Sequence, residues 1–286
     1  MPGVVELWRS AIALVLRHWK LFAGLGIAGL VVPGVLLRLI FSDFYSGENL
    51  SDPTKSPDYP PGLLFATLLL FLLQMLIYNI VVALAASRDE AAGEPLGALA
   101  GRGLKGLGKS LVAGVLVYLA SMVLFIGGFV VTLLLAVLLM MISGIKPSEG
   151  GPADPVVVAF TGLIFVATGA SLAWLALRMA ALAGVYVEEE PGVIDGLKRS
   201  WALSRGHGWW ILRGYLVQLP VLLLLVALQL PLMFGKGGAG AQILAMAVLP
   251  LSTAFWLVLA SWMGLIYRRL ADAETEARRS SVWTAV

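Results

Sequence analysis

The chain of 286 residues is 59% hydrophobic and 13% charged, with a mean hydropathy of +0.91. Soluble domains are roughly 45–50% apolar and about 25% charged, so this composition indicates an integral membrane protein. Cysteine is absent, which excludes disulfides, thiolate metal sites and thiol nucleophiles. The formal charge of +3 comes without a long basic run, so we do not expect a nucleic-acid partner.

Six stretches have the roughly 20 mostly apolar residues that a transmembrane helix needs. They cover residues 21–41, 61–86, 111–142, 156–187, 209–234 and 241–267. The third and fourth are long enough for two spans each, but a turn within lipid would leave backbone groups without hydrogen bonds. We therefore predict an all-α fold with six transmembrane helices in a single polytopic domain, residues 1–286. Bends are expected at Gly127 and Gly128 in the third span and at Gly169 in the fourth.

Lysine and arginine are concentrated in alternate loops. Lys55, Lys146 and Lys236 are the basic residues of one side, in loops 42–60, 143–155 and 235–240. The opposite side holds the other loop cations and the tail 268–286. Because cytoplasmic loops carry the excess of Lys and Arg, we expect both termini in the cytoplasm.

Residues 193–205 read as an amphipathic helix that lies on the membrane surface. Arginine, serine and a later tryptophan recur at one spacing: Arg9 and Ser10 before Trp19, and Arg199 and Ser200 before Trp209. The helical pattern places Val193, Ile194, Leu197 and Trp201 on one face, and Asp195, Lys198, Arg199 and Arg205 on the other.

Two further segments, 4–16 and 96–109, show the same amphipathic pattern. The second is rich in glycine, which costs about 1 kcal/mol per residue in a helix interior, so we expect it to fold only when docked. The pattern suggests a threefold repeat, in which each unit is a surface helix followed by two spans: residues 1–90, 91–187 and 188–286. Amphipathic linkers are common between spans, so an ancestral triplication and a chance pattern both stay open.

The segment GVIDGLKRSWALSRGHGWWIL carries a family resemblance. Together with AAGEPLGALAGRGLKGLGKSL, it resembles the cytoplasmic segments of YciC-like bacterial membrane proteins and of the membrane domain found with some glycerophosphodiester phosphodiesterases. The resemblance implies a six-helix protein of the bacterial inner membrane and no catalytic residues. The chain departs from the family in lacking a proline between Met179 and Val185. The matching positions are Glu188, Glu189, Glu190, Pro191, Gly192, Leu197, Arg199, Ser200, Trp201, Leu203, Arg205, Gly206 and Trp209.

Side chains with reactive chemistry are sparse. No Asp or Glu lies inside a predicted span, which disfavours an ion-coupled transporter. Arg38 and Arg178 lie near span ends and can snorkel to the surface. Residues 188–190 are all glutamate. Two interpretations stay open: they bind a cation or a partner, or they are the solvent-exposed start of the next helix. Gln74, Asn79, Gln218 and Gln229 are expected to bond helix to helix.

These patterns predict a non-enzymatic membrane protein that organises or senses lipid, or is an accessory subunit of a membrane complex. The alternative is the six-span permease subunit of an ABC-type transporter, served by a separate ATPase. No catalytic, cofactor or metal site is expected, and the expected partners are anionic lipid headgroups. The candidate contacts are Arg9, Arg102, Lys105, Lys198, Arg199, Trp201, Arg205 and Trp209.

The predicted topology can be tested with single cysteines, because the chain has none of its own. We expect a membrane-impermeant thiol reagent to label Ser148→Cys in intact cells and to leave Ser280→Cys unlabelled. The reverse pattern would contradict the orientation, and lysed cells provide the control for reactivity at both sites.

Overall fold

The computed structural model describes residues 3–41, 60–87, 95–143, 155–234 and 239–283. These residues are almost entirely helical, with no strand among them. Six helices are long and apolar enough to cross a membrane, which confirms the predicted all-α, six-span fold. The predicted loops 42–60, 143–155 and 235–240 lie almost wholly outside the described residues. The helices are α1 (Val4–Arg17), α2 (Trp19–Gly26), η1 (Ile27–Val31), α3 (Val32–Ile40), α5 (Pro61–Ala86), α6 (Leu96–Ser143), α7 (Pro155–Arg178), α8 (Leu182–Glu188), α9 (Val193–Ser204), α10 (Gly208–Phe234) and α11 (Ala239–Trp283).

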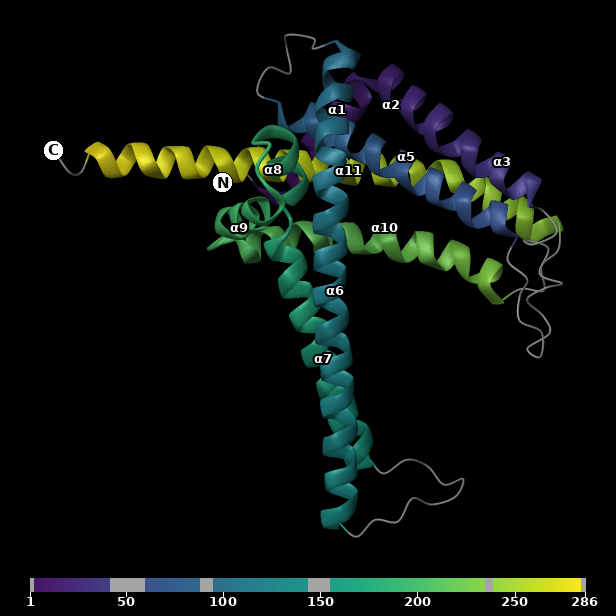
Figure 1. Cartoon of the computed structure of the whole chain (residues 1–286), viewed down its shortest axis with the longest axis vertical. Helices are drawn as coiled ribbons and strands as arrows, with labels where there is room; N and C mark the ends of the chain where they lie inside the picture. Colours follow the sequence, from purple (N-terminus) through teal and green to yellow (C-terminus); the bar gives the residue numbers. More distant parts are fainter. Residues whose placement is uncertain (1–2, 42–59, 88–94, 144–154, 235–238, 284–286) are drawn as a thin grey trace.

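The short helices α1, α8 and α9 gather where α6 begins and α11 passes through, a region called the hub below (Figure 1). From the hub, α2 to α3, α5, α10 and the first half of α11 extend together, and the hairpin of α6 and α7 leaves in another direction. Side chains along α6 are exposed, for example Val123 at 70% and Leu134 at 65%. Apolar surface of this kind on a spanning helix is the surface that meets lipid.

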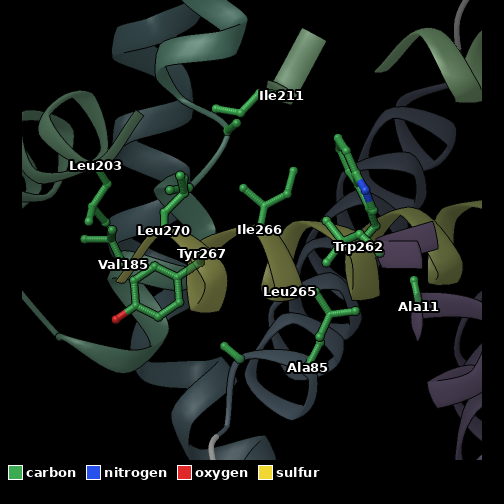
Figure 2. Packing of buried hydrophobic residues seen from close by; sticks show 14 of the residues in the cluster. Ala11, Ala85, Val185, Leu203, Ile211, Trp262, Leu265, Ile266, Tyr267 and Leu270 are labelled. Carbon is green, nitrogen blue, oxygen red and sulfur yellow. The ribbon is translucent and has the colours of Figure 1, made fainter. Parts of the chain in front are cut away.

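The core of the hub is built around one segment of α11, from Trp262 to Leu270. Side chains from α1, α5, α8, α9 and α10 converge on it, as Figure 2 shows. Trp262 stacks on Trp8 of α1 with ring centroids 5.2 Å apart. Three glycines admit this packing: a methyl group at Gly184 would overlap the ring of Tyr267, one at Gly214 would overlap Trp262, and one at Gly264 would lie 2.7 Å from the carbonyl oxygen of Val82.

The predicted surface helix at residues 4–16 is present as α1, but it is docked into the hub. Its buried side chains are Leu7, Trp8, Ala11 and Leu14. The indole N–H of Trp8 donates a hydrogen bond to the carbonyl of Gly214 at 3.2 Å. The helix therefore packs on α10 and α11 through a face that includes Trp8.

The first span contains a π-helical turn, η1, between α2 and α3. Pro33 follows this turn and has no N–H to donate to the carbonyl of Gly29, its α-helical partner. A π turn is a known way to absorb such an irregularity.

The fourth span is broken where the sequence analysis did not place a bend. The helix α7 runs unbroken through Gly169 and ends at Arg178, and α8 begins at Leu182. The Leu182 N–H donates to the carbonyl of Met179. In a continuous α-helix the Leu182 N–H would donate to the carbonyl of Arg178. That carbonyl instead accepts hydrogen bonds from the hydroxyls of Ser200 and Ser204, at 3.0 and 3.2 Å. The two serines of α9 thus replace the hydrogen bond that would continue α7, so the helix ends here although the segment has no proline.

The predicted surface helix at residues 96–109 is not separate from the third span. It is the beginning of α6, which is continuous from Leu96 to Ser143 and also passes through Gly127 and Gly128 unbroken. Gly103 faces Ile80 of α5, and a methyl group at Gly106 would lie 3.1 Å from Val187 of α8. The glycines therefore let this segment dock closely, as a helix, on two neighbours.

We expect Gly264→Ala to lower the free energy of unfolding by about 1–3 kcal/mol, because the added methyl group is too close to the α5 backbone. The matched control is Gly114→Ala in α6, where no atom lies within 4 Å of the added methyl group. The control should be neutral or stabilising by up to about 1 kcal/mol through helix propensity. Unfolding midpoints of the purified proteins measure both, and equal effects would contradict the close packing.

Candidate functional site

Three consecutive glutamates at the end of α8 form ion pairs within the chain. Each side chain is partly exposed, between 21% and 45%. These glutamates and their partners, called the Glu188–Glu190 network below, tie α8 to the start of α6 and to α9. The pairs join Arg102 to Glu188 at 2.9 Å, Lys105 to Glu190 at 3.2 Å and Arg199 to Glu189 at 2.9 Å.

The network continues to α11 through Glu274. Its carboxylate lies 2.7 Å from the guanidinium of Arg199 and 2.7 Å from that of Arg278. The hydroxyl of Tyr267 donates to the carboxylate of Glu189 at 3.1 Å. The hydrogen bonds that Arg199 makes with Glu274 and Glu189 raise its pKa further above the ordinary value. Arg199 is therefore a fixed structural cation.

This network changes the interpretation of three predicted lipid contacts. Arg102, Lys105 and Arg199 each face a glutamate of the same chain. The sequence left open a cation or partner site or a solvated helix start for the three glutamates. The structure instead pairs them with cations of the same chain, and Lys109 adds a hydrogen bond to the carbonyl of Glu190 at 2.6 Å.

The predicted amphipathic helix at residues 193–205 is present as α9, but its faces are not those that the sequence pattern gave. Lys198 was placed opposite Ile194 and Trp201, whereas all three are exposed and share one side of the helix at spacings of i, i+4 and i+7. Arg205 is exposed directly after the helix. The buried side consists of small residues and one leucine: Gly196, Ser200, Leu203 and Ser204. Asp195 and Ala202 are also exposed, at an angle to this side of the helix. We call the four residues Ile194, Lys198, Trp201 and Arg205 the α9 face.

Trp201 joins the α9 face to the end of α7. Its ring meets that of Trp174 edge to face, with centroids 4.8 Å apart. The guanidinium carbon of Arg178 lies 5.4 Å from the Trp201 centroid and 5.5 Å from the Trp174 centroid. The Arg178 Nη1 atom is buried and has no hydrogen-bond partner among the described residues. A cation is thus held against two aromatic rings with donor capacity to spare.

The remaining predicted contacts lie apart from the network. Trp209 is 63% exposed at the start of α10, and the Arg213 guanidinium lies 5.3 Å from its ring centroid. Arg9 is exposed on α1. The basic residues of the three amphipathic segments are therefore not equivalent in the hub, because Arg102 and Arg199 are paired with glutamates whereas Arg9 is exposed.

The sequence analysis missed Arg178 and Glu274 as members of these clusters. The pair of Trp174 and Arg178 has helical i, i+4 spacing and could have been noticed as a local signal. Glu274 has the same spacing to Arg278, but its contact with Arg199 had no such signal, because the two residues lie 75 positions apart along the chain.

Chemically, the arrangement offers positive charge beside aromatic rings at the hub. No group of three or more His, Asp or Glu side chains that could hold a metal ion occurs in the described part of the chain. No family model, curated protein or solved structure matches the chain. The resemblance to YciC-like proteins and its functional implications therefore stay predictions.

We expect the Arg199 and Glu274 side chains to be energetically coupled. In a double-mutant cycle, Arg199→Gln and Glu274→Gln should each destabilise the protein, and the pair should show a coupling of about 1 kcal/mol that falls with added salt. Glu276→Gln is the control, because Glu276 is an exposed carboxylate on the same helix. Strictly additive effects of the two substitutions would contradict the network.

Proposed function

We propose that this protein is a non-enzymatic, multi-pass protein of the bacterial inner membrane whose hub faces the cytoplasm and binds anionic lipid headgroups. The binding surface is the α9 face with Arg178 and Trp174 of α7. The observation that carries the proposal is the placement of the partly exposed Arg178 side chain against Trp174 and Trp201. A phosphate oxygen is a natural acceptor for guanidinium N–H groups.

The composition of the α9 face supports the same occupant. Ile194 is 54% exposed and Trp201 36% exposed, and Lys198 lies on their side of the helix. Apolar and cationic side chains on one exposed face are typical of a helix in the membrane interface, where apolar groups enter the acyl boundary and lysine reaches the headgroups. Tryptophan is the residue that favours this level of the bilayer.

The Glu188–Glu190 network supports a division of roles among the basic residues. Arg102, Lys105 and Arg199 hold helices together through glutamates, so lipid contact falls to Arg178, Lys198 and Arg205. Each basic side chain near an anionic membrane surface contributes about 1 kcal/mol of attraction. Three such residues are enough to hold a headgroup against the hub.

We expect the double variant Lys198→Gln with Arg205→Gln to retain roughly thirtyfold less anionic phospholipid after purification, because about 2 kcal/mol of attraction is removed. Native mass spectrometry of the purified protein measures the bound lipid. Its thermal unfolding should be unchanged, because neither cation belongs to the network. Arg199→Gln should do the reverse, lowering stability while leaving lipid retention intact.

The matched control is Arg269→Gln with Arg279→Gln, which removes the same charge from exposed positions of α11. If the control loses as much lipid as the α9 variant, the attraction is non-specific and the proposed site is wrong. Recovery of a stoichiometric ATPase with the native protein would overturn the proposal in favour of the permease subunit.

A further inference from the structure

A cavity of about 470 Å³ lies between η1, α5 and α11, away from the α9 face. Ile77, Leu257 and Ala260, all buried, form part of its wall. Phe71 and Trp256 also line it and are 44% and 45% exposed. The cavity therefore opens on the flank of the spanning helices, where the surrounding medium is lipid hydrocarbon.

A second cavity of about 190 Å³ adjoins the first. Met75, Tyr78 and Met263 line both cavities, so these side chains separate them. The smaller cavity lies beside the break between α7 and α8, with Met179 and Ala180 in its wall. The larger space thus lies toward η1 and the smaller one toward the break between α7 and α8, on either side of these three side chains.

Polar side chains line the smaller cavity. Asn79 is 1% exposed; its amide donates to the Met75 carbonyl at 3.0 Å and its oxygen accepts the Ser110 hydroxyl at 3.3 Å. Tyr78 and Tyr186 line the same small cavity, and Gln74 lines the larger one. No Lys, Arg, His, Asp or Glu is among the described residues that line either space.

We propose that the two cavities form one binding site for a neutral lipid that has a long apolar chain and a hydroxyl or ester group. The chain occupies the larger cavity, whose volume is within the range of ligand pockets, roughly 300–1,000 Å³. The polar group reaches Asn79, Ser110 and Tyr78, because buried polar side chains in an apolar surrounding are stabilised by a hydrogen-bonding partner. A charged headgroup is excluded because no opposite charge would face it.

The π-helical turn η1, which precedes Pro33, forms part of the wall of the larger cavity. Leu30, within η1, lines the larger cavity. Single π turns inside α-helices occur frequently at functional sites. The site shares no residue with the α9 face and binds a neutral ligand. It is therefore distinct from the proposed binding of anionic headgroups and can be tested separately.

The test uses the full-length protein in phosphatidylcholine vesicles with a long-chain alcohol that carries a diazirine in its chain. After illumination, peptide mapping should place the label on the 71–79 segment of α5 or the 256–263 segment of α11. Attachment mainly to the exposed flanks of α6 would overturn the proposal, since those flanks meet any lipid.

Two variants fill the larger cavity, Met75→Trp on α5 and Leu259→Trp on α11. We expect at least a fivefold loss of labelling in each variant that folds, judged by thermal unfolding. The matched control is Leu69→Trp, an exposed position of α5 at 51%, which should label as the native protein does. Undiminished labelling in either folded filling variant would overturn the site.

The polar end is tested by competition. Ser110→Ala should weaken competition by the unlabelled alcohol about fivefold, the equivalent of one hydrogen bond, and should leave competition by the matched hydrocarbon unchanged. Equal effects on the two competitors would show that the polar end plays no part. Stronger competition by an anionic long-chain phosphate than by the alcohol would contradict the neutral ligand class. The Lys198→Gln, Arg205→Gln double variant should label normally, which separates this site from the α9 face.

Discussion

The packing of five helices against the Trp262–Leu270 segment of α11 is the interaction on which the rest of the structure depends. Helices in a membrane gain little from the hydrophobic effect on association, so close van der Waals contact must hold them together. Gly184, Gly214 and Gly264 provide it by letting aromatic rings or backbone lie where a side chain would otherwise be. Aromatic contacts add to it: the ring of Trp262 lies 5.2 Å from both Trp8 and Tyr215.

This core explains why the fourth span is broken and why charges gather where they do. Because α8 packs on Tyr267 and α9 packs through small residues, Ser200 and Ser204 reach the Arg178 carbonyl and end α7 there. The break places the glutamates at the end of α8, where they meet cations from α6 and α9. Arg199 of α9 in turn meets Glu274 of α11. Polar groups at the hub thus satisfy one another, and the apolar flanks of the helices are left for lipid.

The basic residues consequently separate into two groups with different environments. Those facing glutamates are structural cations, and their charges are largely neutralised. Arg178, which lies against Trp174 and Trp201, has aromatic neighbours, and Lys198 and Arg205 are exposed beside it. This separation is the physical basis for assigning stability to one group and lipid contact to the other. The proposed site for anionic headgroups lies at the rim of the hub, and the proposed site for a neutral lipid lies between the spans.

The six spans, the alternation of positive charge between loops and the family resemblance were all read from short, local stretches of sequence. The sequence by itself determined the all-α class and the number of spans, because about 20 apolar residues and an internally satisfied backbone are properties of each segment alone. It also located α5 and α9 to within a residue or two. Tertiary structure decided which side of α9 is exposed, since the helix buries Gly196 and Ser200, whose small size matters only against a particular neighbour. It also decided that Arg102 and Arg199 are paired, because their glutamate partners Glu188 and Glu274 lie 86 and 75 positions away. The cavities had no sequence signal, because Asn79, Ser110 and Tyr186 come together only when α5, α6 and α8 pack around α11.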